Sequence, residues 1–68
     1  MTLKRRILAF MREHKHQRFT DGELAAYCDA PEPSVRRARL ALERDGVIEA
    51  GNPFAGRATW RLTPTHRR

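Results

Sequence analysis

The feature that most constrains the fold is residues 33–45, a segment that begins with a proline and is followed by Gly46. Proline suits the first turn of a helix, and glycine suits the left-handed position after the last turn, so a helix is predicted between them. Along it, Val35, Ala38 and Leu42 fall within about 60° of one another at 100° per residue. A chain of 68 residues buries only a modest fraction of its surface, so its core must come from a few well-placed apolar side chains. We therefore expect the apolar side of this helix to cover the core.

The other side of the same helix is basic. Opposite the apolar stripe lie Pro33, Arg36, Arg37, Leu40 and Arg44. Arg39 points closer to the stripe, and two interpretations stay open for it. It either contacts an outside partner, or it pairs with Glu43 four residues later and lays its stem on apolar surface. The helix is thus expected to meet the core on one side and an anionic surface on the other.

Two shorter helices are predicted before it. Thr2 can cap a helix that runs to about Glu13, whose apolar face repeats at helical spacing. Thr20 and Glu23 form a capping box at the start of "TDGELAAYC", the second helix. Between the two, Phe19 can form a short extended segment. The stretch "DAPEP" should break the second helix, and a residue before a proline, as Glu32 is, disfavours helical angles.

A β-hairpin is predicted after the third helix. Residues 47–50 and 57–62 read as strands joined by the loop "GNPFAG". In the second strand, Trp60 should point to the core, with Arg57, Thr59 and Arg61 on the opposite face. The polar, proline-broken end predicts a domain spanning residues 1–63 and a flexible basic tail at 64–68.

Charge points to the class of partner. Fourteen Lys and Arg against eight Asp and Glu give a net charge of +6, which suits a polyanion, and nucleic acid is the first candidate. The charge is uneven, because residues 19–34 hold four acids and no base. The N-terminal segment is basic and then apolar, but the apolar run is too short for export or for crossing a membrane, so a cytoplasmic protein is expected.

The sequence gives little support for catalysis, a cofactor or a metal. Cys28 is the single cysteine, which excludes an internal disulfide and predicts a buried structural thiol. His14 and His16 have no further ligand at metal-binding spacing, so no metal is predicted. Capping accounts for Thr20 and Asp21, and nothing resembles a nucleophile elbow or an oxyanion hole, so no enzyme is expected.

Three helices followed by a hairpin resemble a winged helix-turn-helix domain, an α+β and mostly α fold. The stretch "FTDGELAAYCDAPEPSVRRARLALERDGVIEA" is similar to the family's capped helix, turn, recognition helix, glycine stop and first wing strand. The ending "GRATWRL" resembles the basic second wing strand of small bacterial and phage-encoded members. The resemblance covers roughly residues 3–62.

The resemblance implies insertion of the third helix into the DNA major groove, with the hairpin against the adjacent backbone or minor groove. Arg36 and Arg37 are the first candidates for base contact, because the guanidinium fork fits guanine O6 and N7. The further candidates are Ser34, Arg39, Leu40 and Arg44 on the helix, and Arg57 and Arg61 on the wing. The expected partner is double-stranded DNA, in transcriptional regulation, recombination or packaging. A homodimer on the DNA and a protein partner both stay open.

A second interpretation is a winged-helix module that binds a protein. Leu40, the acids of the second helix, or Phe54 at the wing tip would then make the contact. A tip phenylalanine more often folds back onto its own hairpin than enters a groove. The acidic patch, which comprises Asp21, Glu23, Asp29 and Glu32, is a departure from the family, since acids at the start of the second helix weaken contact with phosphate.

Overall fold

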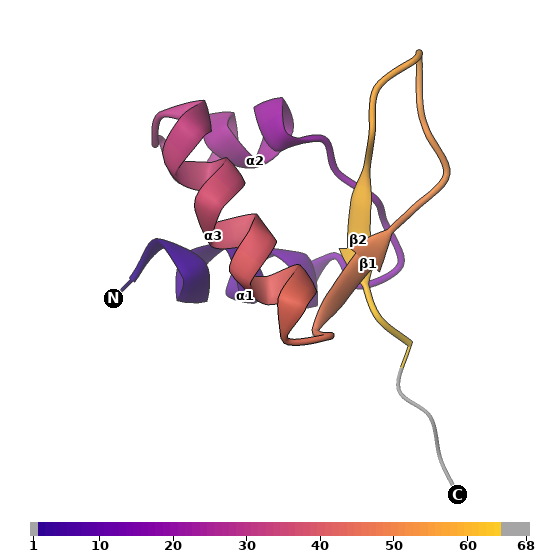
Figure 1. The fold of residues 1–68 in the computed structure, drawn as a ribbon, viewed down its shortest axis with the longest axis horizontal. Coiled ribbons are helices and arrows are strands. Elements are labelled where there is room, and N and C mark those ends of the chain that lie inside the picture. The colour runs from indigo at the N-terminus through magenta and orange to yellow at the C-terminus, as the bar shows by residue number, and fades with distance from the viewer. Residues whose placement is uncertain (1, 65–68) are drawn as a thin grey trace, which may run out of the picture.

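The computed structural model describes residues 2–64, which form three helices followed by a two-stranded antiparallel sheet. The elements are α1 (Leu3–Glu13), α2 (Asp21–Cys28), α3 (Glu32–Arg44), β1 (Ile48–Ala50) and β2 (Trp60–Leu62). Figure 1 shows α3 crossing in front of α1, with the hairpin beside them and its loop extending away from the helices. This order confirms the predicted mostly helical architecture with a hairpin wing.

The predicted tail lies almost entirely outside the described residues, since residues 65–68 are not among them. The division at residue 63 stays a prediction. None of the helices in residues 2–64 has the length and apolar character that crossing a lipid bilayer requires.

Local side-chain caps begin the first two helices as the sequence predicts. The hydroxyl of Thr2 accepts a hydrogen bond from the Arg5 amide at 3.2 Å. At α2, the Thr20 hydroxyl accepts from the Glu23 amide at 3.1 Å, and the Glu23 carboxylate accepts from the Thr20 amide at 2.8 Å. These bonds satisfy amides that have no partner within the helix.

The start of α3 differs from the prediction by one residue. The helix begins at Glu32 rather than Pro33, and Pro31 is its N-cap, with no side-chain cap bond. A proline in the first turn removes no helical hydrogen bond, because amides there have no partner in the helix. The Glu32 carboxylate also lies at the positive end of the helix dipole, which favours this start. At the other end, Gly46 adopts the predicted left-handed backbone, with φ of 78°.

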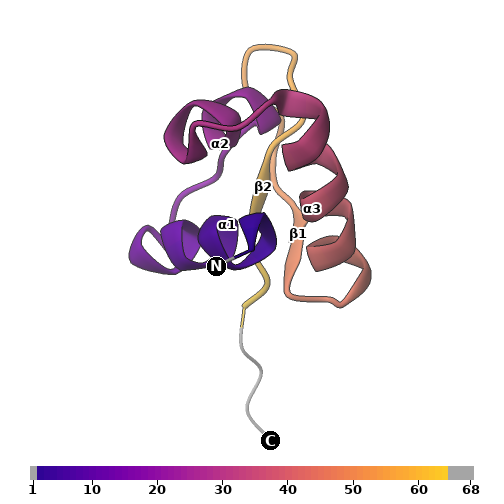
Figure 2. The ribbon, with the colours of Figure 1, turned by 90° about the vertical axis from the view of Figure 1, so that its left-hand side faces the viewer.

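The core lies where the three helices meet the hairpin. Its buried side chains are Ile7, Phe10, Met11, Phe19, Leu24, Cys28, Val35, Leu42, Ile48 and Trp60. Phe19 forms an isolated antiparallel bridge with Trp60, so the chain between α1 and α2 is extended there, as predicted, and this bridge ties it to the hairpin. Figures 1 and 2 together show the hairpin packed along one side of both α1 and α3, which places the wing next to α3.

The strands are shorter than the expected ranges, 47–50 and 57–62. The register pairs Ile48 with Leu62 and Ala50 with Trp60. Beyond Ala50 the chain opens into a loop that closes again where Phe54 bridges Arg57. The two residues between them have φ of 53° and 75°, so a tight turn with left-handed backbone forms the tip.

Thr59 does not share an exposed face with its arginine neighbours, contrary to the prediction. Only 1% of its surface is exposed, and its hydroxyl donates a hydrogen bond to the Asn52 carbonyl at 2.7 Å. Gly51 lies so close that a Cβ there would be 2.9 Å from the Thr59 hydroxyl oxygen. Because of this close approach, side chains do not alternate strictly between the two faces of the strand at the base of the wing.

Candidate nucleic-acid interface

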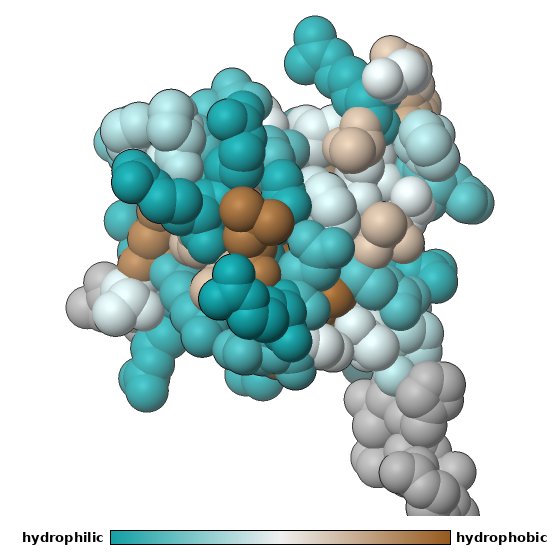
Figure 3. Space-filling view, in the orientation of Figure 1, coloured by the Kyte–Doolittle hydropathy of each residue, from teal (hydrophilic) through white to brown (hydrophobic). Residues whose placement is uncertain are grey.

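The outward side of α3 carries most of the predicted helix candidates. The exposed ones are Arg36, Arg37, Leu40 and Arg44. Figure 3, which views this helix from the front, shows a hydrophobic area over α3 surrounded by hydrophilic surface. Leu40, which is 44% exposed, is the exposed large hydrophobic side chain of that helix. The structure thus places three arginines and one leucine on a single accessible face.

Arg39 lies inside the domain, which corrects its inclusion among the DNA contacts. It is 7% exposed, and its guanidinium donates to Asp21 from Nε at 3.0 Å and from one terminal nitrogen at 2.7 Å. The other terminal nitrogen lies 3.3 Å from the Glu43 carboxylate. The pairing with Glu43 that the sequence left open is therefore present, together with a stronger partner on α2.

The Arg39 guanidinium also stacks on an aromatic ring. Its central carbon is 3.9 Å from the centroid of the Trp60 ring, a cation–π arrangement. The hydrogen bond with Asp21 raises the pKa of Arg39 above its usual value, while burial acts in the opposite direction. One charged side chain thus connects α2, α3 and β2. Sequence reasoning missed this role, although an arginine beside an apolar stripe signals that an acid must lie nearby.

Two of the four acids of the acidic patch, Asp21 and Glu23, are engaged within the domain. Asp21 neutralises Arg39, and Glu23 completes the capping box. Glu32 lies 3.8 Å from Arg36, and Asp21 lies 3.9 Å from the Nε of Arg36, distances longer than a hydrogen bond. Arg36 is half-exposed and held only loosely, so it can leave both carboxylates for an outside anion.

The wing brings one arginine toward this face. Arg57 lines a hollow of about 280 Å³ whose wall includes Asp21 and Glu32, the two carboxylates nearest Arg36. Arg57 therefore borders, from the wing, a depression whose two carboxylates are also the ones nearest Arg36. No carboxylate within residues 2–64 lies within 4.0 Å of Arg57.

Arg61 and Ser34 are less available than expected. Arg61 donates a hydrogen bond from Nε to one Glu49 oxygen across the hairpin at 2.9 Å, and one of its terminal nitrogens lies 2.7 Å from the same oxygen. Its charge is therefore neutralised by a cross-strand partner. Ser34 is half-buried in the first turn of α3.

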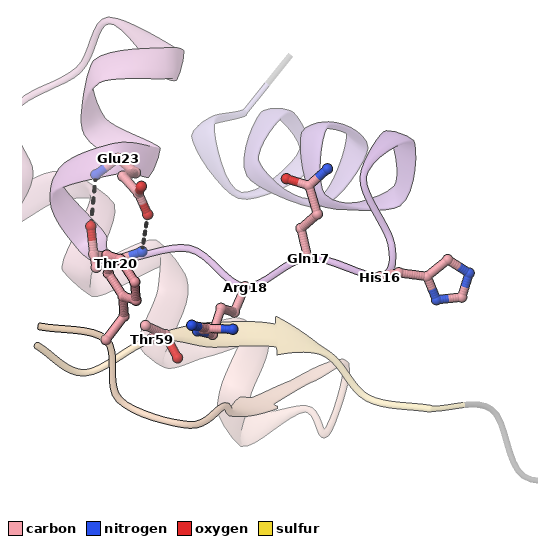
Figure 4. Close-up of a pocket in the computed structure, with 7 residues that line it drawn as sticks. His16, Gln17, Arg18, Thr20, Glu23 and Thr59 are labelled. Atoms are coloured by element: carbon pink, nitrogen blue, oxygen red, sulfur yellow. Dashed lines mark hydrogen bonds between the residues drawn. The ribbon is translucent and has the colours of Figure 1, made fainter.

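A second hollow, of about 320 Å³, lies between the wing and the segment that links α1 to α2. It is lined by His16, Gln17, Arg18, Thr20, Glu23, Phe54 and Thr59. Figure 4 shows Thr20 and Glu23 exchanging their two capping bonds, Arg18 beside Thr59, and the His16 ring pointing away from them. The polar groups of Thr20 and Glu23 are thus engaged in starting α2.

Phe54 lies in the wing loop and lines the second hollow together with Thr59 of its own hairpin. It is 60% exposed, and the Arg18 guanidinium lies 5.3 Å from the centroid of its ring. This cation–π contact links the wing loop to the α1–α2 connection.

The side chains of Cys28 and His14 pack against other residues of the domain. Cys28 is buried, as predicted, and burial raises the pKa of its thiol, while the nearby Arg6 acts in the opposite direction. The His14 ring lies 4.8 Å from the Phe10 ring. Across residues 2–64, no three His, Cys, Asp or Glu side chains gather to hold a metal ion.

Comparison with known proteins supports the fold. No family model matches the chain, and no curated protein matches it either. Among solved structures, the ferric uptake regulator of Francisella tularensis with iron matches with a TM-score of 0.83 at 12% sequence identity. The match covers 98% of this chain and 55% of that one, so this chain spans about half the length of the regulator. The fold of residues 2–64 is that of a winged helix.

Proposed function

We propose that this chain binds duplex DNA with sequence preference, as a small transcriptional regulator or as an accessory in recombination or packaging of the phage type. The observation that carries the proposal is the outward face of α3, where Arg37, Leu40 and Arg44 are exposed while Val35 and Leu42 are buried beneath them. The likeness to a ferric uptake regulator adds support through the fold.

In this proposal α3 enters the major groove with its N-terminal half toward the bases. Arg37 is fully outward, and its planar fork can bind guanine O6 and N7 together. Leu40 can contact a thymine methyl group, and Arg44, one turn further along, can bind phosphate. Arg36 would leave the carboxylates of Asp21 and Glu32, which it contacts only loosely, and bind DNA instead.

The wing supplies a contact outside the groove that α3 occupies. Arg57 borders the hollow shared with the start of α3 and can bind the backbone beside the groove. Arg61 contributes less, because Glu49 already neutralises it. The proposed activity is binding alone, without a catalytic step, a cofactor or a metal, by a homodimer on the DNA or together with a protein partner.

The protein-binding alternative has less support. Leu40 is a single apolar side chain among arginines, whereas protein interfaces concentrate aromatic and apolar residues at their centre. Asp21 and Glu23 are occupied by Arg39 and by the capping box. An acidic docking surface would need these carboxylates free.

Selection from a random duplex library, followed by sequencing, tests the proposal. We expect one enriched site, to which Arg37→Ala binds more weakly by about 1–3 kcal/mol, with relaxed preference at one base pair. Lys15→Ala, which removes one exposed charge from the turn after α1, is the matched control and should bind the site within about twofold of the parent. Absence of an enriched site, or equal binding by Arg37→Ala, would overturn the proposal.

A further inference from the structure

The basic residues of α1 divide into two groups. Lys4 pairs with Asp45 at 2.9 Å, and Arg6 donates to the Cys28 carbonyl at the end of α2 at 2.6 Å, so both serve the fold. Arg5 and Arg12 are exposed, and within residues 2–64 neither has a carboxylate within 4.0 Å. Two arginine charges on α1 are therefore unused by the domain itself.

These two arginines lie on one face. A separation of seven residues corresponds to about two helical turns, so their directions differ by about 20° and their positions by about 10 Å along the axis. Between them lies Ala9, which is exposed and short. The face is therefore a shallow strip with a guanidinium at each end, a shape that a phosphate backbone can approach closely.

This outer face of α1, defined by Arg5, Ala9 and Arg12, points away from the proposed groove-binding side of α3. The opposite side of α1 buries Ile7 and Met11 in the core that it shares with α3. Figure 1 shows α3 crossing in front of α1, so the outer face of α1 lies on the side of that helix away from α3. A straight duplex lying along α3 therefore cannot also lie on α1.

The chemistry of the strip favours a nucleic acid over a protein partner. The exposed large hydrophobic side chains of residues 2–64 are Tyr27, Leu40 and Phe54, none of them on α1. Protein interfaces need a large apolar centre, whereas this strip has only Ala9 at its centre, and Tyr27 lies at its edge, in the hollow that Ala9 also lines. Unpaired arginines spaced along a helix suit the repeating charge of a phosphate backbone, which requires no apolar contact.

We propose that the outer face of α1 is a second DNA-binding surface, on which Arg5 and Arg12 hold the phosphate backbone of another duplex without sequence preference. One domain then bridges two duplexes, with α3 and the wing on the first and α1 on the second. This inference rests on the proposed function, because the first duplex is held by α3.

A capture assay tests the bridging. The selected duplex is fixed to beads, the protein is added, and the amount of a labelled duplex of unrelated sequence retained from solution is measured. We expect Arg5→Ala/Arg12→Ala to lower this capture at least about tenfold, while affinity for the selected duplex alone changes by less than about twofold. The control variant Arg5→Lys/Arg12→Lys keeps both charges and should retain capture. Circular dichroism checks that each variant is folded.

The outcomes separate the two proposals. If the parent binds the fixed duplex but retains none of the second one, bridging is wrong while the proposed function stands. If the double alanine variant retains as much as the parent, the strip on α1 is not the second surface, and this inference is wrong. If the parent binds no duplex at all, the proposed function itself fails.

Discussion

Asp21 accepts two hydrogen bonds from Arg39, at 3.0 and 2.7 Å, and so joins the first turn of α2 to the middle of α3. Both side chains are mostly buried, and the ring of Trp60 covers the guanidinium. Because the pair fixes α3 against α2, it also fixes the direction in which Arg36 and Arg37 point. The ion pair inside the domain therefore orients the arginines outside it.

Removing this partner should destabilise the fold. Asp21→Ala leaves a buried guanidinium with only the more distant Glu43, and we expect the free energy of unfolding to fall by about 3 kcal/mol. The free energy of unfolding is measured by urea titration monitored by circular dichroism. The control is Glu43→Ala, which removes a more exposed carboxylate and should cost less than about 1 kcal/mol. Equal losses in the two variants would contradict the assigned role of Asp21.

Two glycines should respond in opposite ways to alanine. In Gly51→Ala the new Cβ would lie 2.9 Å from the hydroxyl oxygen of Thr59, which is buried and bonded to the Asn52 carbonyl. We expect a loss of about 1–2 kcal/mol. In Gly22→Ala, on α2, the nearest atom is 3.8 Å away, and alanine restricts the unfolded chain, so a gain of about 0.5–1 kcal/mol is expected. Thermal unfolding distinguishes the two, and a stabilised Gly51→Ala would contradict the close approach.

The thiol of Cys28 should react slowly with alkylating reagents. It should also make the stability of the fold fall as the pH rises into the alkaline range. Burial raises the pKa of its thiol in the folded state, so folding favours the protonated form. This contribution is complete below the ordinary thiol pKa and is lost as the pH rises through the folded value. We expect alkylation by iodoacetamide at pH 8 to be about 100-fold slower in the folded protein than in concentrated urea. Equal rates would show that the thiol is accessible.

The parts of the fold that short-range signals determine were predictable. The capping box of Thr20 and Glu23 involves residues three apart, and Gly46 ends α3 through its own backbone freedom. The buried side of α3 followed from helical spacing, which is fixed once the helix is recognised. These features need no knowledge of the rest of the chain.

The parts that depend on distant residues were not predictable in the same way. Arg39 and Asp21 are 18 positions apart, so their pairing requires the angle between two helices. The contact of Arg61 with Glu49 requires the register of the hairpin, which the loop sequence does not determine. Arg61 looked available from the sequence, and Arg39 was left open, because Glu49 and Asp21 meet them only after folding.

The most direct test of the account is the salt dependence of binding to the selected duplex. With about four phosphate contacts, the logarithm of the association constant should fall with the logarithm of salt concentration at a slope near −3.6. Arg57→Ala should reduce the slope by about 0.9, whereas Glu49→Ala/Arg61→Ala, which removes a neutral pair, should leave it unchanged. A parent slope near zero, or an unchanged slope in Arg57→Ala, would contradict a DNA-binding face formed by α3 and the wing.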